Sequence, residues 1–279
     1  MSLVYLNGQF LPLEDARIPV TDRGFIFGDG VYEVIPVYGR HPLALERHLD
    51  RLDHSLSGIR MENPLPRSAW RSLIAELVQH EPDNNQTLYI QLTRGSAPRE
   101  HAFPREVTPT LFAMAKPLVP PPAHWLHEGV QAITHADFRW LQCDLKTTAL
   151  LANVLLRQKA ADQGAAECIL LRDGYLTEGA ASNVLVVVDG VLLSPPENHL
   201  ILSGITLSLV MELARQYQVP VEERPVTESG LRRAEEIMLT SSVREIIPVT
   251  RLDNQPVGNG KPGPVFTRLQ SLYQGIKYA

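Results

Sequence analysis

The spacing of apolar residues divides the first 116 residues into strands and helices, as in a mixed α+β domain. Asn7-Gly8, between two short apolar runs, is typical of a type I′ hairpin turn. From residue 45 to residue 59, apolar side chains recur every three or four positions and outline one face of a helix. The expected elements are strands at 3–6, 9–11, 31–38, 88–92 and 111–115 and helices at 45–59 and 69–78.

A proline-rich stretch follows this part of the chain. Four prolines between positions 117 and 122 predict an interdomain linker over 117–128. Residues 129–279 are then expected to form a second, larger domain. Residues 184–188 are all apolar, which is typical of a strand buried on both faces. The expected elements here are strands at 130–133, 167–172, 183–188 and 237–240, helices after Thr148 and at 207–216, and hairpin turns at Asp173-Gly174 and Asp189-Gly190.

Composition excludes several classes of protein. The chain has 279 residues, 44% of them hydrophobic, as in an ordinary soluble globular protein. A formal net charge of −5 argues against nucleic acid as the main partner, and no apolar stretch approaches the roughly 20 residues that span a membrane. The chain does not start like a secretion signal, and Cys143 and Cys168 are too few for a disulfide framework or a zinc site. We therefore expect a cytoplasmic protein without a metal site.

Lys146 is a candidate for chemistry because of its position. It lies just before a run of apolar residues at helical spacing, for which Thr147 or Thr148 is a suitable N-cap. The positive end of a helix dipole disfavours a cation, so this position favours a neutral amine. A neutral amine can form a Schiff base with a carbonyl cofactor such as pyridoxal phosphate. An ordinary surface lysine is the alternative, so the hypothesis depends on other segments.

A pyridoxal cofactor also needs an acidic partner for its ring nitrogen and a site for its phosphate. Glu178, among the small residues of 177–183, could keep the ring nitrogen protonated, unless it is a glutamate at a hairpin end that faces water. Residues 203–206 (Ser-Gly-Ile-Thr) precede a predicted helix, whose first N–H groups can bind an anion, although a plain helix start is equally open. The hydroxyls of 240–242 and the cation of Arg51 could add to this site.

Residues 94–104, which we call the substrate loop, offer Arg99 and His101 two positions apart. A guanidinium and an imidazole that point the same way can hold a carboxylate of a substrate. A solvated basic loop without function is the alternative.

Four blocks of the sequence occur in the order and spacing of a known family. The block Asp22-Arg23-Gly24-Phe25-Ile26-Phe27-Gly28-Asp29-Gly30-Val31-Tyr32-Glu33 resembles the N-terminal block of the class IV (fold-type IV) pyridoxal-phosphate aminotransferases. The Lys146 segment and residues 177–183 and 204–206 follow in the family's order, so the resemblance covers essentially the whole chain. It implies an α+β / α/β fold of two domains, a small N-terminal α+β domain and a larger C-terminal pseudo-barrel domain, with pyridoxal 5′-phosphate as cofactor.

Within that family, the substrate loop resembles the loop of the D-amino acid branch. The resemblance implies transfer of the amino group of a D-amino acid, above all D-alanine, to a 2-oxo acid such as 2-oxoglutarate, in ping-pong fashion through a Schiff base on Lys146. It implies that Tyr32, Arg99 and His101 hold the substrate carboxylate, the last two from the neighbouring subunit of a homodimer. The residues that it implies for the cofactor are Lys146, Glu178, Arg51, Leu202, Gly204, Ile205, Thr206, Ser241 and Ser242.

The sequence departs from the family pattern at two places. Phe25 stands where a tyrosine is often found, and Ala180-Ala181 stand where serines follow the glutamate. These changes could alter substrate scope without removing a catalytic group. An aminodeoxychorismate lyase, a branched-chain L-amino acid aminotransferase and an (R)-amine transaminase of the same fold remain open. A pyridoxal-phosphate carrier without activity is disfavoured, because it would need no residues for a substrate carboxylate.

Overall fold

The chain forms two compact units, each described here by itself. In the computed structural model, which describes residues 3–278, one unit contains Met1–Val119 with Leu145–Leu150, and the other contains Pro120–Asp144 with Leu151–Ala279. The chain therefore changes unit three times, although only the proline-rich stretch carries a linker signal. The region expected as linker, 117–128, includes a short helix, α4 (Ala123–Glu128).

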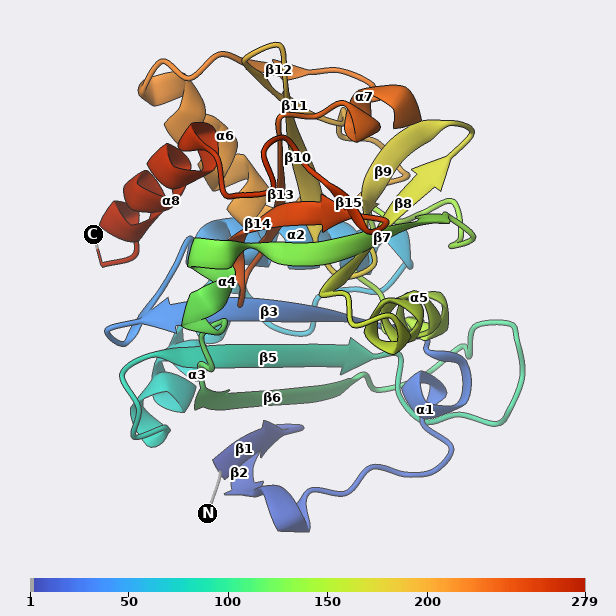
Figure 1. Ribbon diagram of the computed structural model, residues 1–279. Helices are drawn as coiled ribbons and strands as arrows, with labels where there is room; N and C mark the ends of the chain where they lie inside the picture. The colour runs from blue at the N-terminus through green and yellow to red at the C-terminus, as the bar shows by residue number, and fades with distance from the viewer. Residues whose placement is uncertain (1–2, 279) are drawn as a thin grey trace. The chain divides into compact units, whose positions relative to one another are not determined.

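The first unit contains a six-stranded sheet with the strand order β2-β1-β6-β5-β3-β4 and antiparallel pairing (Figure 1). Its strands are β1 (Leu3–Leu6), β2 (Gln9–Pro12), β3 (Gly30–Tyr38), β4 (His41–Pro42), β5 (Gln86–Thr93) and β6 (Thr110–Pro117). Its helices are η1 (Leu13–Asp15), α1 (Arg23–Phe27), α2 (Leu45–Gly58) and α3 (Arg67–His80). The predicted strands and helices of this part are confirmed, whereas the short helix α1 was not predicted.

The leucines that recur every three or four positions in α2 pack into the core of the first unit. Leu49, Leu52 and Leu56 of α2 are almost fully buried in one cluster with Ile35 of β3 and Leu88 of β5. The predicted turn at Asn7-Gly8 is also confirmed, because both residues have positive φ angles (48° and 95°).

The second unit contains a nine-stranded sheet with the strand order β12-β11-β10-β13-β14-β7-β8-β9, with β15 paired to β14. Its strands are β7 (Val130–Ala136), β8 (Glu167–Arg172), β9 (Tyr175–Gly179), β10 (Asn183–Val188), β11 (Val191–Ser194), β12 (Val221–Glu223), β13 (Glu236–Ser241), β14 (Glu245–Leu252) and β15 (Gln255–Pro256). β9 and β10 are far apart in this order, yet only residues 180–182 join them in sequence. The sheet must therefore curl, which gives the half-barrel expected of a fold-type IV domain.

Four helices accompany this sheet besides α4: α5 (Leu151–Asp162), α6 (Ile205–Gln216), α7 (Glu228–Arg232) and α8 (Pro264–Ile276). Two predictions made for this unit are confirmed. Val184–Val187 of β10 are buried, as the uninterrupted apolar run requires. Asp173 and Asp189 have positive φ angles (51° and 52°) in the turns after β8 and β10.

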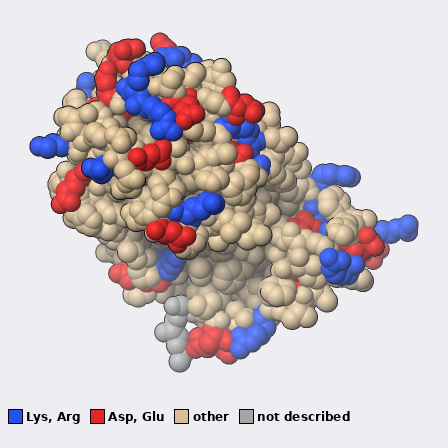
Figure 2. All heavy atoms as spheres, turned by 45° about the vertical axis from the view of Figure 1, so that its right-hand side comes forward, with Lys and Arg blue, Asp and Glu red and all other residues tan. Residues whose placement is uncertain are grey.

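The surface carries both signs of charge. On the face shown in Figure 2, lysine and arginine side chains are interspersed with aspartate and glutamate side chains. None of the helices within residues 3–278 is long and apolar enough to cross a membrane. Across the same residues, no group of three or more histidine, cysteine, aspartate or glutamate side chains could hold a metal ion.

Candidate active site

Lys146 belongs to the first unit, where its backbone is tied to the start of β3. The Tyr32 N–H donates to the Lys146 carbonyl oxygen at 3.0 Å, and the Lys146 N–H donates to Ser55 Oγ at 3.1 Å. Lys146 Nζ lies 4.3 Å from the centroid of the Tyr32 ring, within the range of a cation–π contact. The structure thus brings the predicted catalytic lysine and one predicted substrate residue together.

The helix that follows Lys146 begins later than the sequence suggested. The first residue of α5 is Leu151, so neither Thr147 nor Thr148 is its N-cap, and that prediction is wrong. The Thr148 hydroxyl instead donates to the Gly28 carbonyl at 2.9 Å. The effect of a helix dipole fades within one turn, so it does not explain the chemistry of a lysine five positions before the helix.

Arg51, predicted to bind phosphate, is buried and paired with a carboxylate that the sequence analysis missed. Arg51 Nε and Nη2 lie 2.8 and 2.9 Å from Glu33 Oε1 and Oε2, and His48 Nδ1 lies 2.9 Å from Glu33 Oε2. Burial alone would raise the pKa of Glu33, but the charge and hydrogen bonds of Arg51, together with His48, hold it well below its usual range. An ionised Glu33 therefore orients Arg51.

Replacing Glu33 with glutamine is expected to lower the free energy of unfolding by about 2 kcal/mol, because Arg51 keeps an acceptor but loses a buried counter-charge. The pKa of Glu33 in the folded protein lies below its ordinary value of 4.5. Glu33 therefore stabilises the fold above pH 4.5, and this stabilisation is lost as the pH falls below 4.5 toward the folded-state pKa. Urea unfolding between pH 3 and 7 should show less acid destabilisation in Glu33→Gln than in the wild type. The exposed Glu62→Gln is the control, and equal acid profiles for Glu33→Gln and the wild type would contradict the assignment.

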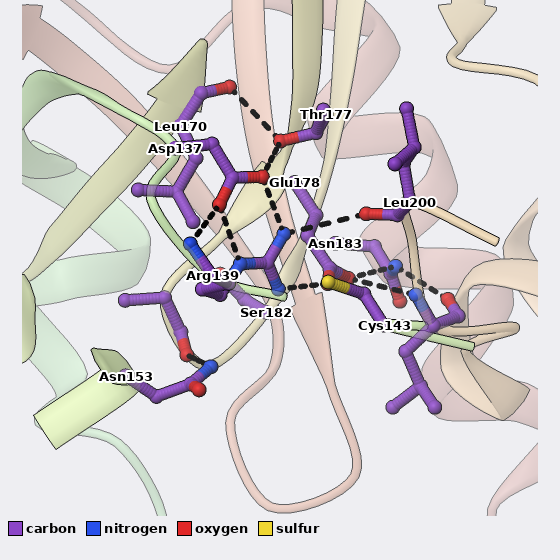
Figure 3. Close-up of polar contacts among 12 residues, drawn as sticks. Asp137, Arg139, Cys143, Asn153, Leu170, Thr177, Glu178, Ser182, Asn183 and Leu200 are labelled. Carbon is purple, nitrogen blue, oxygen red and sulfur yellow. Dashed lines mark hydrogen bonds and ion pairs between the residues drawn. The ribbon is translucent and has the colours of Figure 1, made fainter. Parts of the chain in front are cut away.

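Glu178 lies on β9 of the second unit and is only 5% exposed, so it does not face water. Its Oε1 pairs with the Arg139 guanidinium, and its Oε2 accepts hydrogen bonds of 3.1 Å from Asn183 Nδ2 and from the Leu202 N–H. Figure 3 shows the side chains of Glu178, Arg139 and Asn183 close together. Burial raises the pKa of Glu178 to about 7, against the opposing effect of Arg139. A carboxylate whose pKa is tuned in this way can share a proton with a basic partner near neutral pH.

Arg139 and its own partner Asp137 were not found from the sequence. Arg139 Nε and Nη2 lie 3.0 and 2.9 Å from the two oxygens of Asp137 (Figure 3). Asp137 also pairs with Arg172 at 3.1 Å. Charges thus alternate in the order Arg172, Asp137, Arg139 and Glu178. Asp137 and Arg139 follow β7 with no distinctive local pattern, so only the folded chain reveals that they serve Glu178.

Apart from Arg51 of the first unit, the predicted phosphate residues lie at the start of α6 and around the end of β13 in the second unit. Gly204 is the N-cap of α6, no side chain caps this helix, and its first N–H groups have no acceptor within the helix. A Cβ on Gly204 would meet Asn183 Oδ1 at 1.9 Å, so any other residue here would have to displace the Asn183 side chain. Asn183 pairs with Thr240 across the sheet, which brings the α6 start beside the hydroxyls at 240–242. Leu202, Ile205, Thr206, Ser241 and Ser242 all lie in this part of the unit.

The hydroxyl of Thr240, at the end of β13, is buried and has no hydrogen-bond partner among residues 3–278. An unpaired buried hydroxyl beside uncapped N–H groups is a donor set that suits a phosphate dianion.

The substrate loop places Arg99 and His101 together, but against Phe27 and not against Tyr32. The Arg99 guanidinium carbon lies 5.3 Å from the Phe27 ring centroid, and the His101 ring centroid lies 5.4 Å from it. Both side chains are exposed. Within residues 3–278, neither makes a hydrogen bond or an ion pair with Tyr32 or Lys146.

Comparisons with known proteins agree on one family. Residues 30–252 match the family described as amino-transferase class IV. The chain is 40% identical to a D-alanine aminotransferase of Bacillus licheniformis, over 97% of this chain and 95% of that protein, and 37% identical to one of Staphylococcus epidermidis, over 98% and 97%.

Solved structures give the same picture of the fold. A branched-chain amino acid aminotransferase of Escherichia coli matches with a TM-score of 0.92 and 26% identity, over 98% of this chain and 94% of that one. A fold IV transaminase of Curtobacterium pusillum matches with a TM-score of 0.82 and 27% identity, over 97% and 93%.

Proposed function

Because this chain belongs to the class IV aminotransferase family, we propose that it transfers the amino group of a D-amino acid, above all D-alanine, to a 2-oxo acid such as 2-oxoglutarate. The observation that carries the proposal is 37–40% identity to D-alanine aminotransferases over nearly the whole chain. The branched-chain aminotransferase of Escherichia coli shares the fold but only 26% of the sequence. The fold is therefore common to both substrate classes, and the sequence favours the D-amino acid branch.

Pyridoxal 5′-phosphate is the cofactor that membership of this family implies. The uncapped start of α6 and the unpaired Thr240 hydroxyl fit its phosphate. When bound, this cofactor withdraws electrons from the α-carbon of an attached amino acid. The residues that would hold it are Lys146, Glu178, Arg51, Leu202, Gly204, Ile205, Thr206, Ser241 and Ser242.

The protein's own residues would divide the remaining work. Lys146 would anchor the cofactor through Nζ and, once the substrate amine replaces it, take the proton from the substrate α-carbon. The Tyr32 ring, 4.3 Å from Nζ, limits where that amine can move. Glu178 would keep a proton on the ring nitrogen, and the single face served by Lys146 would determine which enantiomer reacts.

Arg99 and His101 would bind the substrate carboxylate in a homodimer with a shared site. In one chain they are exposed and separate from Tyr32, as expected of residues that act in the partner copy. A cytoplasmic location is part of the same proposal, because Cys143 and Cys168 are both unpaired thiols, which suits a reducing compartment.

The test is a half-reaction on purified holoenzyme, followed by the absorbance of the cofactor. D-Alanine should convert the cofactor and 2-oxoglutarate should restore it, whereas L-alanine, L-leucine and a simple (R)-amine should react at least tenfold more slowly. Conversion by L-leucine would favour the branched-chain activity, and conversion by the (R)-amine would favour an amine transaminase. Formation of p-aminobenzoate from aminodeoxychorismate, without need of a 2-oxo acid, would favour the lyase.

A further inference from the structure

The block 22–30 has no role in the proposed function, yet its side chains contact the substrate loop at several positions. Arg23 is almost fully buried. Its guanidinium donates to three successive carbonyl oxygens of the loop, at 2.5 Å to Glu100, 3.3 Å to His101 and 3.4 Å to Ala102. One rigid group with several donors therefore fixes the backbone on both sides of His101.

Asp29 connects Arg23 to a second arginine of the same network. Its Oδ2 lies 2.7 Å from Arg23 Nε and 2.8 Å from Arg94 Nε. Burial alone would raise the pKa of Asp29, but the hydrogen bonds from both arginines outweigh it and lower the pKa. Arg94 also lies 3.8 Å from the centroid of the Phe103 ring, so the network reaches the far end of the loop.

Phe27 contacts the two residues that are proposed to bind the substrate carboxylate, Arg99 and His101. Its ring contacts the Arg99 guanidinium and the His101 imidazole, as well as the Arg23 guanidinium at 4.8 Å. Arg99 and His101 therefore share one aromatic surface, which limits their rotamers and keeps them on the same side of the loop.

Residues 22–29 have the sequence features that begin and end the short helix α1 and place it against the substrate loop. The Asp22 carboxylate caps α1 by accepting from the Gly24 N–H at 2.8 Å. Gly28 ends the helix with a positive φ angle of 66°, which turns Asp29 toward Arg23 and Arg94. These features place one short helix, too short to be stable alone, against the substrate loop.

We propose that α1, with Arg23, Phe27 and Asp29 as positioning residues, holds the substrate loop in the conformation in which Arg99 and His101 bind a carboxylate. The proposal rests on the proposed function and adds to it. The N-terminal block then determines how strongly the enzyme prefers amines that carry a carboxylate over amines that do not.

The test compares the rates at which two small reagents react with the cofactor of the holoenzyme. Both reagents attack the carbonyl carbon of the cofactor, and they differ in one group. Aminooxyacetate carries a carboxylate and methoxyamine does not, so the ratio of their second-order rate constants measures carboxylate recognition. Phe27→Leu is expected to lower this ratio roughly tenfold, with little change in the rate of methoxyamine. Phe25→Leu, on the same helix but with a side chain 73% exposed, is the matched control and should keep the wild-type ratio.

Arg23→Lys provides a second variant, since it keeps the charge opposite Asp29 but loses the guanidinium that serves three carbonyls. A ratio unchanged in Phe27→Leu would overturn the inference, as would an equal fall in both rates. Failure of the proposed function is visible separately, as a wild-type holoenzyme that does not respond to D-alanine. A wild type that responds to D-alanine, with a lowered ratio in Phe27→Leu and not in Phe25→Leu, would support the inference.

Discussion

Replacing Lys146 with alanine is expected to reduce transamination of D-alanine by roughly 10²–10⁴-fold, the range for loss of a positioned proton-transfer group. The protein should still fold, because the hydrogen bonds that tie this segment to Tyr32 of β3 and to Ser55 of α2 are made by backbone atoms of Lys146. Production of pyruvate measures the activity. The cofactor should also be removed by gel filtration from Lys146→Ala but not from the wild type.

Three further measurements test whether the effect is specific to Lys146. Lys159→Ala, which removes an exposed lysine of α5, should keep full activity and cofactor. Added methylamine should restore part of the activity of Lys146→Ala, since a free amine can replace the missing base. Borohydride reduction of the wild-type holoenzyme should attach the cofactor to the peptide that contains Lys146. Attachment to another lysine, or an active Lys146→Ala protein, would remove Lys146 from its role.

Replacing Arg139 with methionine is expected to lower the free energy of unfolding by roughly 3–5 kcal/mol, because it leaves Glu178 buried without its cation. Asp137 keeps Arg172 as a partner, so the loss falls mainly on Glu178. The double variant Arg139→Met/Glu178→Gln removes the buried charge and should regain most of the stability. The free energy of unfolding should be measured in urea on cofactor-free protein. A protonated ring nitrogen of the cofactor beside Glu178 would change the pKa of Glu178.

The effect of Glu178 on the free energy of unfolding depends on pH. The pKa of Glu178 rises from 4.5 to about 7 on folding, so its contribution to stability is fully present below pH 4.5 and is lost as the pH rises through 7. That shift corresponds to about 3 kcal/mol. Arg139 lowers the pKa of Glu178, so Arg139→Met should extend the loss to higher pH.

Glu178→Gln is expected to remove the fall in stability between pH 4.5 and 7, and Arg139→Met is expected to extend that fall above pH 7. Arg251→Met, which changes an exposed arginine, serves as the control. If Arg139→Met were as stable as the wild type at pH 8, Arg139 would not support Glu178.

Much of the fold could be predicted because its signals are local. The turns at Asn7-Gly8 and Asp189-Gly190 need positive φ angles that these residues tolerate, and the apolar run of β10 shows a strand buried on both faces. The start of α5 was misplaced because the threonines before it have better partners in the first unit. A sequence cannot show such competition between a local cap and a distant acceptor.

The sequence by itself determined the strand and helix pattern, the family and the identity of the candidate cofactor and substrate residues, because each depends on residue types at fixed spacing. Only the tertiary structure decided what supports those residues. Glu33 lies 18 positions from Arg51, Arg139 lies 39 from Glu178, and Arg23 lies 77 from the Glu100 carbonyl that it holds. These pairs are made by charge and hydrogen-bond geometry across strands and loops, and no pattern along the chain records which distant partner a buried charge will meet.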